Sequence, residues 1–379
     1  MPLIKVPQCD PGSTYQVYKD EIDSAISNVM ESGWYILGDQ VKKFEESFAS
    51  YHSVGRGIGV GSGTDALVLA LKVCNIGPGD AVITVSHTAV ATVSAISVVG
   101  ALPVLVDVNV TTYTMDVDKL EETVASFKKD HPNVTLKAII PVHLYGYPCD
   151  MDRIKKITNE HGLYLIEDCA QAHGAEYKGS KAGGYGQFSA FSFYPTKNLG
   201  AFGDGGILLA NDDDLAERAK QLREYGWKER YISYEVGMNT RLDELQAAIL
   251  SVKLKYLEKE NENRISIANH YSNSLNRDSF SLPFVVGDVK HVFHQYVIRV
   301  HNREELMSYM RERGIGTAIH YPLPVHQQPA YRERISIGAG GLGVTESITT
   351  EIVSLPIYPQ LKMDQVDLVC DVMNDWARE

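Results

Sequence analysis

Short apolar runs alternate with helix-like stretches between residues 55 and 210, after a first helical pattern at 14–31. The apolar runs lie at 57–61, 81–85, 103–107, 137–142, 163–167, 188–193 and 205–210. Between several of them, stretches such as TDALVLALKV and VDKLEETVASFKK repeat apolar residues every three or four positions, as helices packed on a core do. This alternation predicts an α/β fold with a mostly parallel sheet covered on both faces. Ligands of such sheets bind in the loops at the carboxyl ends of the strands.

The pattern changes beyond the predicted sheet. Residues 242–272 carry a long helical pattern of mixed charge, and the segments HVFHQYVIRV, NREELMSYMRERG and VDLVCDVMNDWARE predict a strand, a helix and a terminal helix. The glycine-rich stretch 338–347 predicts a mobile surface loop. We therefore predict a large domain over residues 1–245 and a smaller α+β domain over residues 246–379.

The composition is that of a globular protein, with 44% hydrophobic and 22% charged residues. Its net charge of −12 argues against a general nucleic-acid binder, because neutralising phosphates needs a basic face. The five cysteines never stand in C-x-x-C spacing, which is typical of a reducing cytosol and argues against a structural zinc site. The N-terminus lacks the apolar core of a signal peptide, so we expect a cytoplasmic protein.

One stretch without acidic or basic residues, from Ala81 to Val106, exceeds the ~20 residues of a membrane span. It contains polar residues that suit a bilayer core poorly, including Ser86 and Thr88. It divides more naturally into a strand, a helix at 88–99 and a second strand, so we predict no membrane segment.

The first stretch with candidate chemistry is GVGSGTDAL at 59–67, at a predicted strand-to-helix junction. A helix N-terminus has free N–H groups and a positive partial charge, so it can hold a phosphate. The dinucleotide fingerprint fails because Thr64 stands where its third glycine would fall, and the Walker A lysine is missing. Taken alone, the stretch fits a phosphate site and a plain turn capped by Thr64 equally well.

Two further stretches carry ionisable groups after apolar runs. Asp168 follows one run, where a buried carboxylate would need a partner, although a helix cap or a surface turn would also explain it. Lys197 stands among aromatic, hydroxyl and glycine residues in SAFSFYPTKNLG, a setting that lowers the pKa of an amine and makes it a nucleophile. An imine-forming lysine, an acid for a pyridine nitrogen and a phosphate cup are what pyridoxal phosphate needs.

These stretches, in this order, resemble the DegT/DnrJ/EryC1/StrS family of pyridoxal-phosphate sugar aminotransferases. Further matching motifs, which extend the resemblance over essentially the whole chain, are GWYILG (33–38), PVHLYG (141–146), NTRLDE (239–244) and IHYP (319–322). The resemblance implies the type I, aspartate aminotransferase-like fold. It also implies a homodimer with active sites at the subunit boundary.

The resemblance further implies roles for individual residues. Lys197 would form the imine with pyridoxal 5′-phosphate, and Asp168 would pair with the pyridine nitrogen. The other implied cofactor contacts are Gln171 near the ring hydroxyl, Gly63, Thr64 and Ser192 at the phosphate, and Asn239 reaching in from the neighbouring subunit. The implied substrate contacts are Tyr35, Tyr225, His320 and Tyr321.

One turn departs from the family pattern. Family members commonly carry an aromatic residue there that stacks on the cofactor ring, and here Ala89 takes its position in the sequence SHTAV. We expect either that His87 stacks on the ring instead or that only apolar contacts cover it. No metal site is predicted, because His291 and His294 would point to opposite faces of a strand.

The implied reaction is the transfer of an amino group from glutamate to a nucleotide-linked keto sugar. Lys197 is present, whereas the dehydratase branch of the family has a histidine at this position. The lysine loop YPTKNLGAFGDGG is similar to that of members that aminate C3, which predicts a dTDP-3-keto-6-deoxyhexose as the substrate. The alternatives are C4 amination of a nucleotide-linked 4-keto-6-deoxysugar and a non-catalytic, pyridoxal-phosphate-binding regulatory protein of the same fold.

Overall fold

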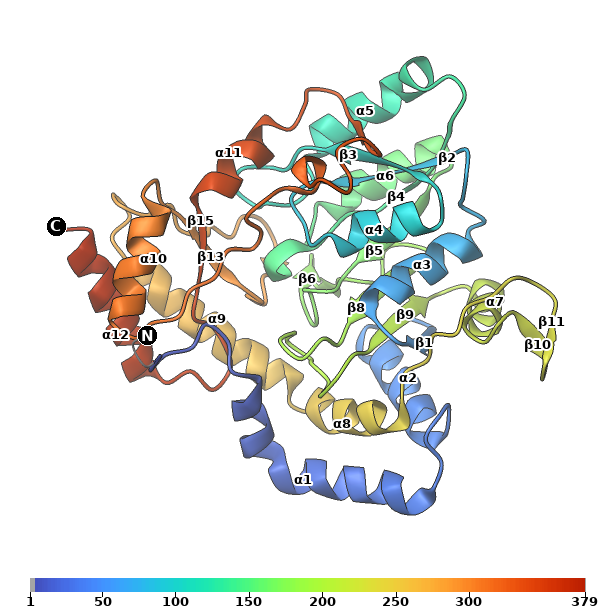
Figure 1. Cartoon of the computed structure of the whole chain (residues 1–379), viewed down its shortest axis with the longest axis horizontal. Coiled ribbons are helices and arrows are strands. Elements are labelled where there is room, and N and C mark those ends of the chain that lie inside the picture. Colours follow the sequence, from blue (N-terminus) through green and yellow to red (C-terminus); the bar gives the residue numbers. More distant parts are fainter. Residues whose placement is uncertain (1–3, 379) are drawn as a thin grey trace.

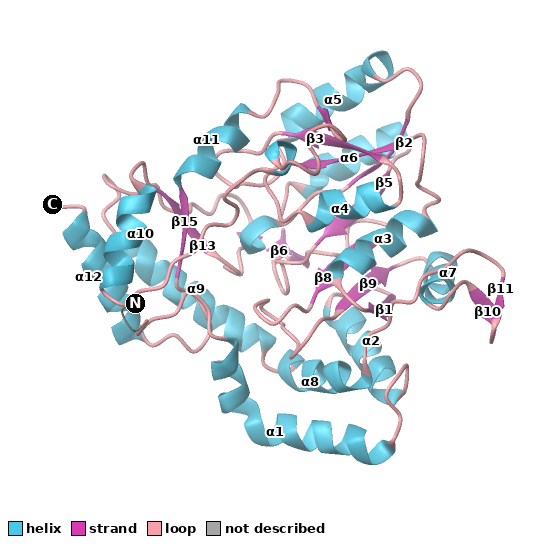
Figure 2. Cartoon of the chain, in the orientation of Figure 1, coloured by secondary structure: helices cyan, strands magenta, loops and turns pink. Residues whose placement is uncertain are grey.

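An eight-stranded sheet forms the centre of the protein in a computed structural model that describes residues 4–378 (Figures 1 and 2). Its strand order is β1-β9-β8-β5-β4-β2-β3-β14. The strands are β1 (Arg56–Val60), β2 (Asp80–Val85), β3 (Leu102–Val106), β4 (Thr135–Ile139), β5 (Tyr164–Asp168), β8 (Phe188–Ser192), β9 (Gly206–Ala210) and β14 (Ser336–Ile337). Strand β9 runs antiparallel to both of its neighbours, and the other neighbouring strands are parallel. The seven predicted apolar runs therefore all form strands of this mostly parallel sheet.

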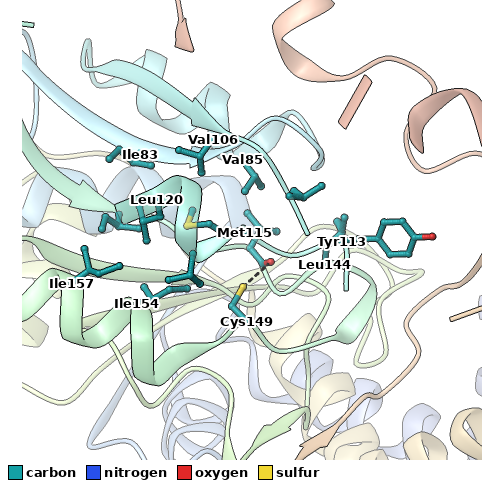
Figure 3. Close-up of a cluster of buried hydrophobic side chains, with 14 of the residues drawn as sticks. Ile83, Val85, Val106, Tyr113, Met115, Leu120, Leu144, Cys149, Ile154 and Ile157 are labelled. Atoms are coloured by element: carbon teal, nitrogen blue, oxygen red, sulfur yellow. Dashed lines mark hydrogen bonds between the residues drawn. The ribbon is translucent and has the colours of Figure 1, made fainter. Parts of the chain in front are cut away.

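Helices cover both faces of the sheet, as the near-continuous apolar strands require. They are α3 (Gly63–Val73), α4 (Ala91–Val98), α5 (Val117–Asp130), α6 (Met151–His161) and α7 (Asp213–Arg223). Ile83 and Val85 of β2 pack on one face with residues of α5 and α6, as Figure 3 shows, whereas Val82 packs on the other face with α3. Successive strand residues thus enter opposite cores. The uncharged stretch 81–106 lies inside this arrangement.

Four long helices run along the lower side of the sheet in Figure 1 and lead into the C-terminal part. They are α1 (Pro11–Ser32), α2 (Asp39–Tyr51), α8 (Glu244–Leu254) and α9 (Leu257–Ser274). The helix predicted over 242–272 divides at Tyr256, whose N–H bonds to the carbonyl of Lys253 rather than continuing the helical pattern. The ring of Tyr256 stacks on the ring of Tyr18 with 4.1 Å between the centroids. Helix α1 is kinked at Tyr18. The two helices therefore both change direction where their tyrosines meet.

A second core lies beyond α9, around a two-stranded sheet flanked by helices. Its elements are β13 (Tyr296–Arg299), β15 (Ile352–Leu355), α10 (Arg303–Glu312) and α12 (Met363–Trp376). Two contacts cross the predicted boundary near residue 245. Val6, from the N-terminal side of the boundary, packs in this second core, and β14, from the C-terminal side, pairs with β3 at the edge of the large sheet. The domain boundaries stay a prediction.

The segment 338–347 differs from its prediction as a mobile loop. Helix α11 (Gly343–Glu351) begins inside it, because the buried carboxylate of Asp107 accepts the N–H groups of Val344 and Thr345 at 2.8 Å each. An acceptor from outside the helix thus caps its first turn. The loop prediction is therefore wrong for residues 343–347.

Several short elements complete the described chain. They are β6 (Glu176–Tyr177), β7 (Ser180–Lys181), β10 (Trp227–Glu229), β11 (Ile232–Ser233), β12 (Val289–Lys290) and the 3₁₀ turns at Leu144–Gly146 and Val325–Gln327. Among the helices of residues 4–378, none has the length and apolar character that crossing a bilayer requires.

Candidate active site

A cavity of about 250 Å³ opens at the carboxyl ends of β2, β4 and β5. Its walls come from the loop between β1 and α3, the turn after β2, the end of β5 and the loop after β8. The lining residues include Ser62, Gly63, Thr64, Thr88, Ala89, Val142, Asp168, Ala170, Gln171, Ser192 and Lys197. The structure thus brings the three predicted stretches to one place, where α/β sheets bind their ligands.

The first wall is the N-terminus of α3. Its cap is Ser62, whose side chain accepts the N–H of Asp65 at 3.1 Å, so the predicted capping role of Thr64 falls to its neighbour. A Cβ on Gly63 would stand 2.7 Å from the Cβ of Ser192, and this close approach therefore needs glycine. The start of α3 and the hydroxyl side chains of Thr64 and Ser192 thus line one cavity and form a candidate anion site, since a helix N-terminus favours a phosphate.

Asp168 ends β5 and is only 5% exposed. Its Oδ2 accepts the hydroxyl of Thr92 at 2.7 Å, and its Oδ1 accepts the N–H of Ala170 at 3.1 Å. No helix begins at this residue, and burial excludes a surface turn. Asp168 is therefore a buried carboxylate in the cavity wall, with one donor on each oxygen.

Lys197 enters the cavity from the loop after β8. Burial lowers the pKa of its amine to about 8, although the negative charge of Asp168 acts in the opposite direction. The loop is fixed by the next residue, Asn198, whose Nδ2 donates to Asn261 Oδ1 at 2.9 Å and to the carbonyl of Val292 at 3.1 Å. The amine is thus held in place and is easily deprotonated, as a nucleophile requires.

Gln171 and Tyr321 connect the cavity to the C-terminal part of the chain. The Gln171 side chain accepts the N–H of Tyr145 at 2.7 Å and donates to the hydroxyl of Tyr321 at 3.0 Å. Burial raises the pKa of Tyr321 to about 12, so this residue is a neutral phenol. The adjacent His320 bonds through Nδ1 to the hydroxyl of Ser354 at 2.8 Å.

His87 is buried behind the cavity wall and does not line it. Its Nε2 bonds to the hydroxyl of Tyr145 at 2.8 Å, and burial lowers its pKa to about 4. Thr88 and Ala89 line the cavity in its place. Whether His87 or apolar contacts cover the cofactor ring stays a prediction.

Besides His87, His320 and Tyr321, three more predicted residues lie outside the lining of this cavity. Tyr35, Tyr225 and Asn239 are all exposed at the surface. All three roles stay predictions.

One buried group of potential metal ligands occurs among residues 4–378, formed by His143, Glu167 and Cys169. The Glu167 carboxylate already accepts the N–H groups of Gly183, Tyr185 and Gly186 and lies 3.2 Å from His143 Nε2. Its oxygens are thus occupied in fixing the turn before β8. The prediction that no metal binds stays a prediction.

Thr92, Asn198 and Asn261 support the site but were not predicted. The available signal for Thr92 was its spacing of four residues from Thr88 within the helix expected over 88–99, although α4 begins only at Ala91. Together, the anion site, the buried carboxylate and the deprotonatable lysine match the phosphate, the ring nitrogen and the aldehyde of pyridoxal phosphate.

Comparison with known proteins supports this match. The profile of the DegT/DnrJ/EryC1/StrS aminotransferase family matches residues 16–374. A dTDP-3-amino-3,6-dideoxy-alpha-D-galactopyranose transaminase from Aneurinibacillus thermoaerophilus is 46% identical over 360 residues, 95% of this chain and 96% of the relative. A pleiotropic regulatory protein from Geobacillus stearothermophilus is 42% identical over 378 residues, 99% of each chain.

A solved structure is similar over the full length. The crystal structure of DesV from S. venezuelae, in complex with a ketimine intermediate, matches with a TM-score of 0.93 at 41% identity and covers 100% of both chains.

Proposed function

The chain belongs to the DegT/DnrJ/EryC1/StrS aminotransferase family, and on that premise we propose that it transfers the amino group of glutamate to C3 of a dTDP-linked 3-keto-6-deoxyhexose. The protein is a sugar aminotransferase of the type I fold, and pyridoxal 5′-phosphate is its cofactor. The observation that carries the proposal is the single cavity that joins Lys197, Asp168 and the anion site at the start of α3. The relative that makes a dTDP-3-amino sugar supports the choice of C3.

The residues of the cavity would have separate roles in the reaction. Pyridoxal phosphate supplies an electron sink and carries the amino group between two half-reactions. Gly63, Thr64 and Ser192 would hold its phosphate, and Asp168 would keep a proton on its ring nitrogen. Lys197 would take the α-proton of the amino donor on Nζ and return it to the cofactor side, which a pKa near 8 makes possible in both directions.

We also propose that the active protein is a homodimer in the cytoplasm. The hairpin of β10 and β11 projects beyond α7 at the edge of the molecule (Figure 1). The hairpin and the residues that follow it expose large apolar side chains, including Tyr231 at 72% and Val236 at 87%. Such a patch is typical of an interface, and Asn239 follows directly after it in the chain. If a second copy of the chain covered this patch, Asn239 of the first copy would lie close to the cavity of the second.

The decisive experiment separates the two half-reactions. The purified protein with bound pyridoxal phosphate is mixed with glutamate, and the loss of the cofactor's visible absorbance is followed. The aminated form is then offered dTDP-linked 3-keto and 4-keto 6-deoxyhexoses, and products are read by mass spectrometry. We expect an amino sugar from the 3-keto substrate and no reaction with Lys197→Ala. Product from the 4-keto sugar alone would contradict C3 amination and establish C4 amination.

A regulatory protein is the second candidate, favoured by the name of the relative from Geobacillus stearothermophilus. A regulator would bind pyridoxal phosphate without consuming glutamate. The intact pair of Lys197 and Asp168 in one cavity supports the enzyme instead. Absence of the glutamate half-reaction in the protein with bound cofactor would favour the regulator.

A further inference from the structure

Thr92 is a buried polar residue that none of the assigned roles uses. It lies in the first turn of α4, is 0% exposed and is not part of the cavity lining. Its hydroxyl donates to Oδ2 of Asp168 at 2.7 Å, across 76 residues of sequence. A threonine hydroxyl has one hydrogen to donate, and here Asp168 receives it.

The partners of Asp168 show why this contact matters. The carboxylate is nearly excluded from water, where an ion is costly unless donors compensate it. Among the described residues, its two hydrogen-bond donors are Thr92 on Oδ2 and the Ala170 N–H on Oδ1. The Ala170 bond is local and fixes one oxygen only. Thr92 therefore supplies the second donor and sets the plane of the carboxylate.

We propose that Thr92 is a positioning residue for transamination, which holds the Asp168 carboxylate in the plane that faces the ring nitrogen of pyridoxal phosphate. This inference deepens the proposed function and rests on it, since it requires the cofactor's nitrogen to lie at Asp168. The hydrogen bond from Thr92 fixes one oxygen of the carboxylate in place. Without it, the carboxylate can turn away from the ring nitrogen and holds that nitrogen's proton less well.

The test compares two ligands in four proteins. Dissociation constants are measured by absorbance titration for pyridoxal phosphate and for its 1-deaza analogue, in which carbon replaces the ring nitrogen. The proteins are the unaltered chain, Thr92→Val, Thr92→Ser and Thr84→Val. Valine keeps the shape of threonine without its donor, and serine keeps the donor.

We expect Thr92→Val to weaken pyridoxal phosphate binding about tenfold, in line with the loss of one hydrogen bond to a charged group. Binding of the deaza analogue should stay the same, because that ligand has no ring proton for Asp168 to hold. Thr92→Ser should restore the preference for pyridoxal phosphate. A purely structural role would instead weaken both ligands together.

Thr84→Val is the matched control. Thr84 is also 0% exposed, and its hydroxyl donates to the carbonyl of Ile140 at 2.8 Å, away from the Asp168 carboxylate. The Thr84→Val protein should be less stable, because a buried hydroxyl loses its hydrogen bond. It should still prefer pyridoxal phosphate to the deaza analogue as the unaltered chain does. Should Thr92→Val fail to fold, Thr92→Ala removes the same donor with less bulk and replaces it in the comparison.

The outcomes distinguish the inference from its premise. If the unaltered chain prefers pyridoxal phosphate and Thr92→Val keeps that preference, the role of Thr92 is wrong and Asp168 retains its own. If the unaltered chain binds both ligands equally, the assignment of Asp168 fails and the role of Thr92 fails with it.

Discussion

Lys197 and Asp168, two ionisable side chains of opposite charge, share the cavity, and the charge of Asp168 affects the pKa of Lys197. Burial favours the neutral amine of Lys197, while Asp168 favours the protonated one. The first effect dominates, so the pKa lies at about 8, below the ordinary 10.5 of lysine. The protein without cofactor therefore carries a much larger fraction of nucleophilic amine at pH 8 than a surface lysine would.

This balance predicts a pH dependence for cofactor capture. Only the neutral amine attacks the aldehyde, so the capture rate should rise with pH and level off above about pH 8. Asp168→Asn removes the charge that raises the pKa of Lys197, so its profile should level off at lower pH. Stopped-flow absorbance after mixing with pyridoxal phosphate measures both profiles. A midpoint near 10 in the unaltered chain would contradict the burial argument.

The site of attachment is a second prediction at this scale. Lys253 is the rival, because burial lowers its pKa to about 8 as well, but its amine donates to the carbonyl of Gly200 and does not line the cavity. Borohydride reduction followed by peptide mapping should therefore place the cofactor on Lys197. Label on Lys253 would show that the cavity has been misassigned.

Sequence alone could single out Lys197 and Asp168, because Asp168 ends one apolar run and Lys197 lies in the loop that follows another. It could not predict the orientation of His87 or the donor on Asp168. Those depend on contacts with Tyr145 and Thr92, which lie 58 and 76 residues away in sequence and are set by packing.

At the scale of secondary-structure elements, one side chain joins two of the sequence motifs. Glu244 in NTRLDE is buried, and its carboxylate accepts the N–H groups of Gly38, Gln40 and Val41 at 2.8–2.9 Å. These donors belong to the first turn of α2, which has no capping side chain of its own. Glu244 therefore fixes the start of α2 from the start of α8.

Removing this cap should destabilise the protein measurably. Glu244→Ala should lower the free energy of unfolding by about 2 kcal/mol, since three buried N–H groups lose a charged acceptor. Glu244→Gln keeps one acceptor oxygen and should lose less. Urea denaturation at one fixed protein concentration measures both, with Glu262→Ala on the exposed side of α9 as the control. Equal stability of Glu244→Ala and the control would disprove the cap.

Elements with a clean apolar period were predictable, and those shaped by a distant partner were not. Seven of the eight sheet strands follow from their own residues, and β14 (Ser336–Ile337) is the one that was not predicted. The break at Tyr256 interrupts a helical pattern that is continuous in sequence, and α11 begins where Asp107, 237 residues earlier in the chain, caps it. Both features come from tertiary contacts that override local preference.

At the scale of the whole molecule, the proposed dimer predicts that inactive chains rescue each other. Lys197→Ala lacks the nucleophile, and Asn239→Ala lacks the residue proposed to reach the neighbouring cavity. Mixed chains should form one complete site per heterodimer, with lysine from the Asn239→Ala chain and asparagine from the Lys197→Ala chain. Activity of the mixture after confirmed subunit exchange measures this.

The test requires the Asn239→Ala homodimer to be clearly impaired by itself. If it is impaired and the mixture stays inactive, the sites are not shared. Sedimentation of the unaltered chain as a monomer at working concentration would also exclude sharing.

The strand β14 has a consequence for how this chain can be divided. It returns from the C-terminal part to pair with β3, while Val6 at the other end of the chain packs in the C-terminal core. A gene split at residue 245 would thus leave each fragment without a piece of its own core and would open the sheet beside β3 to edge-to-edge aggregation. The two halves should remain insoluble when made separately and should fold only when they are synthesised together.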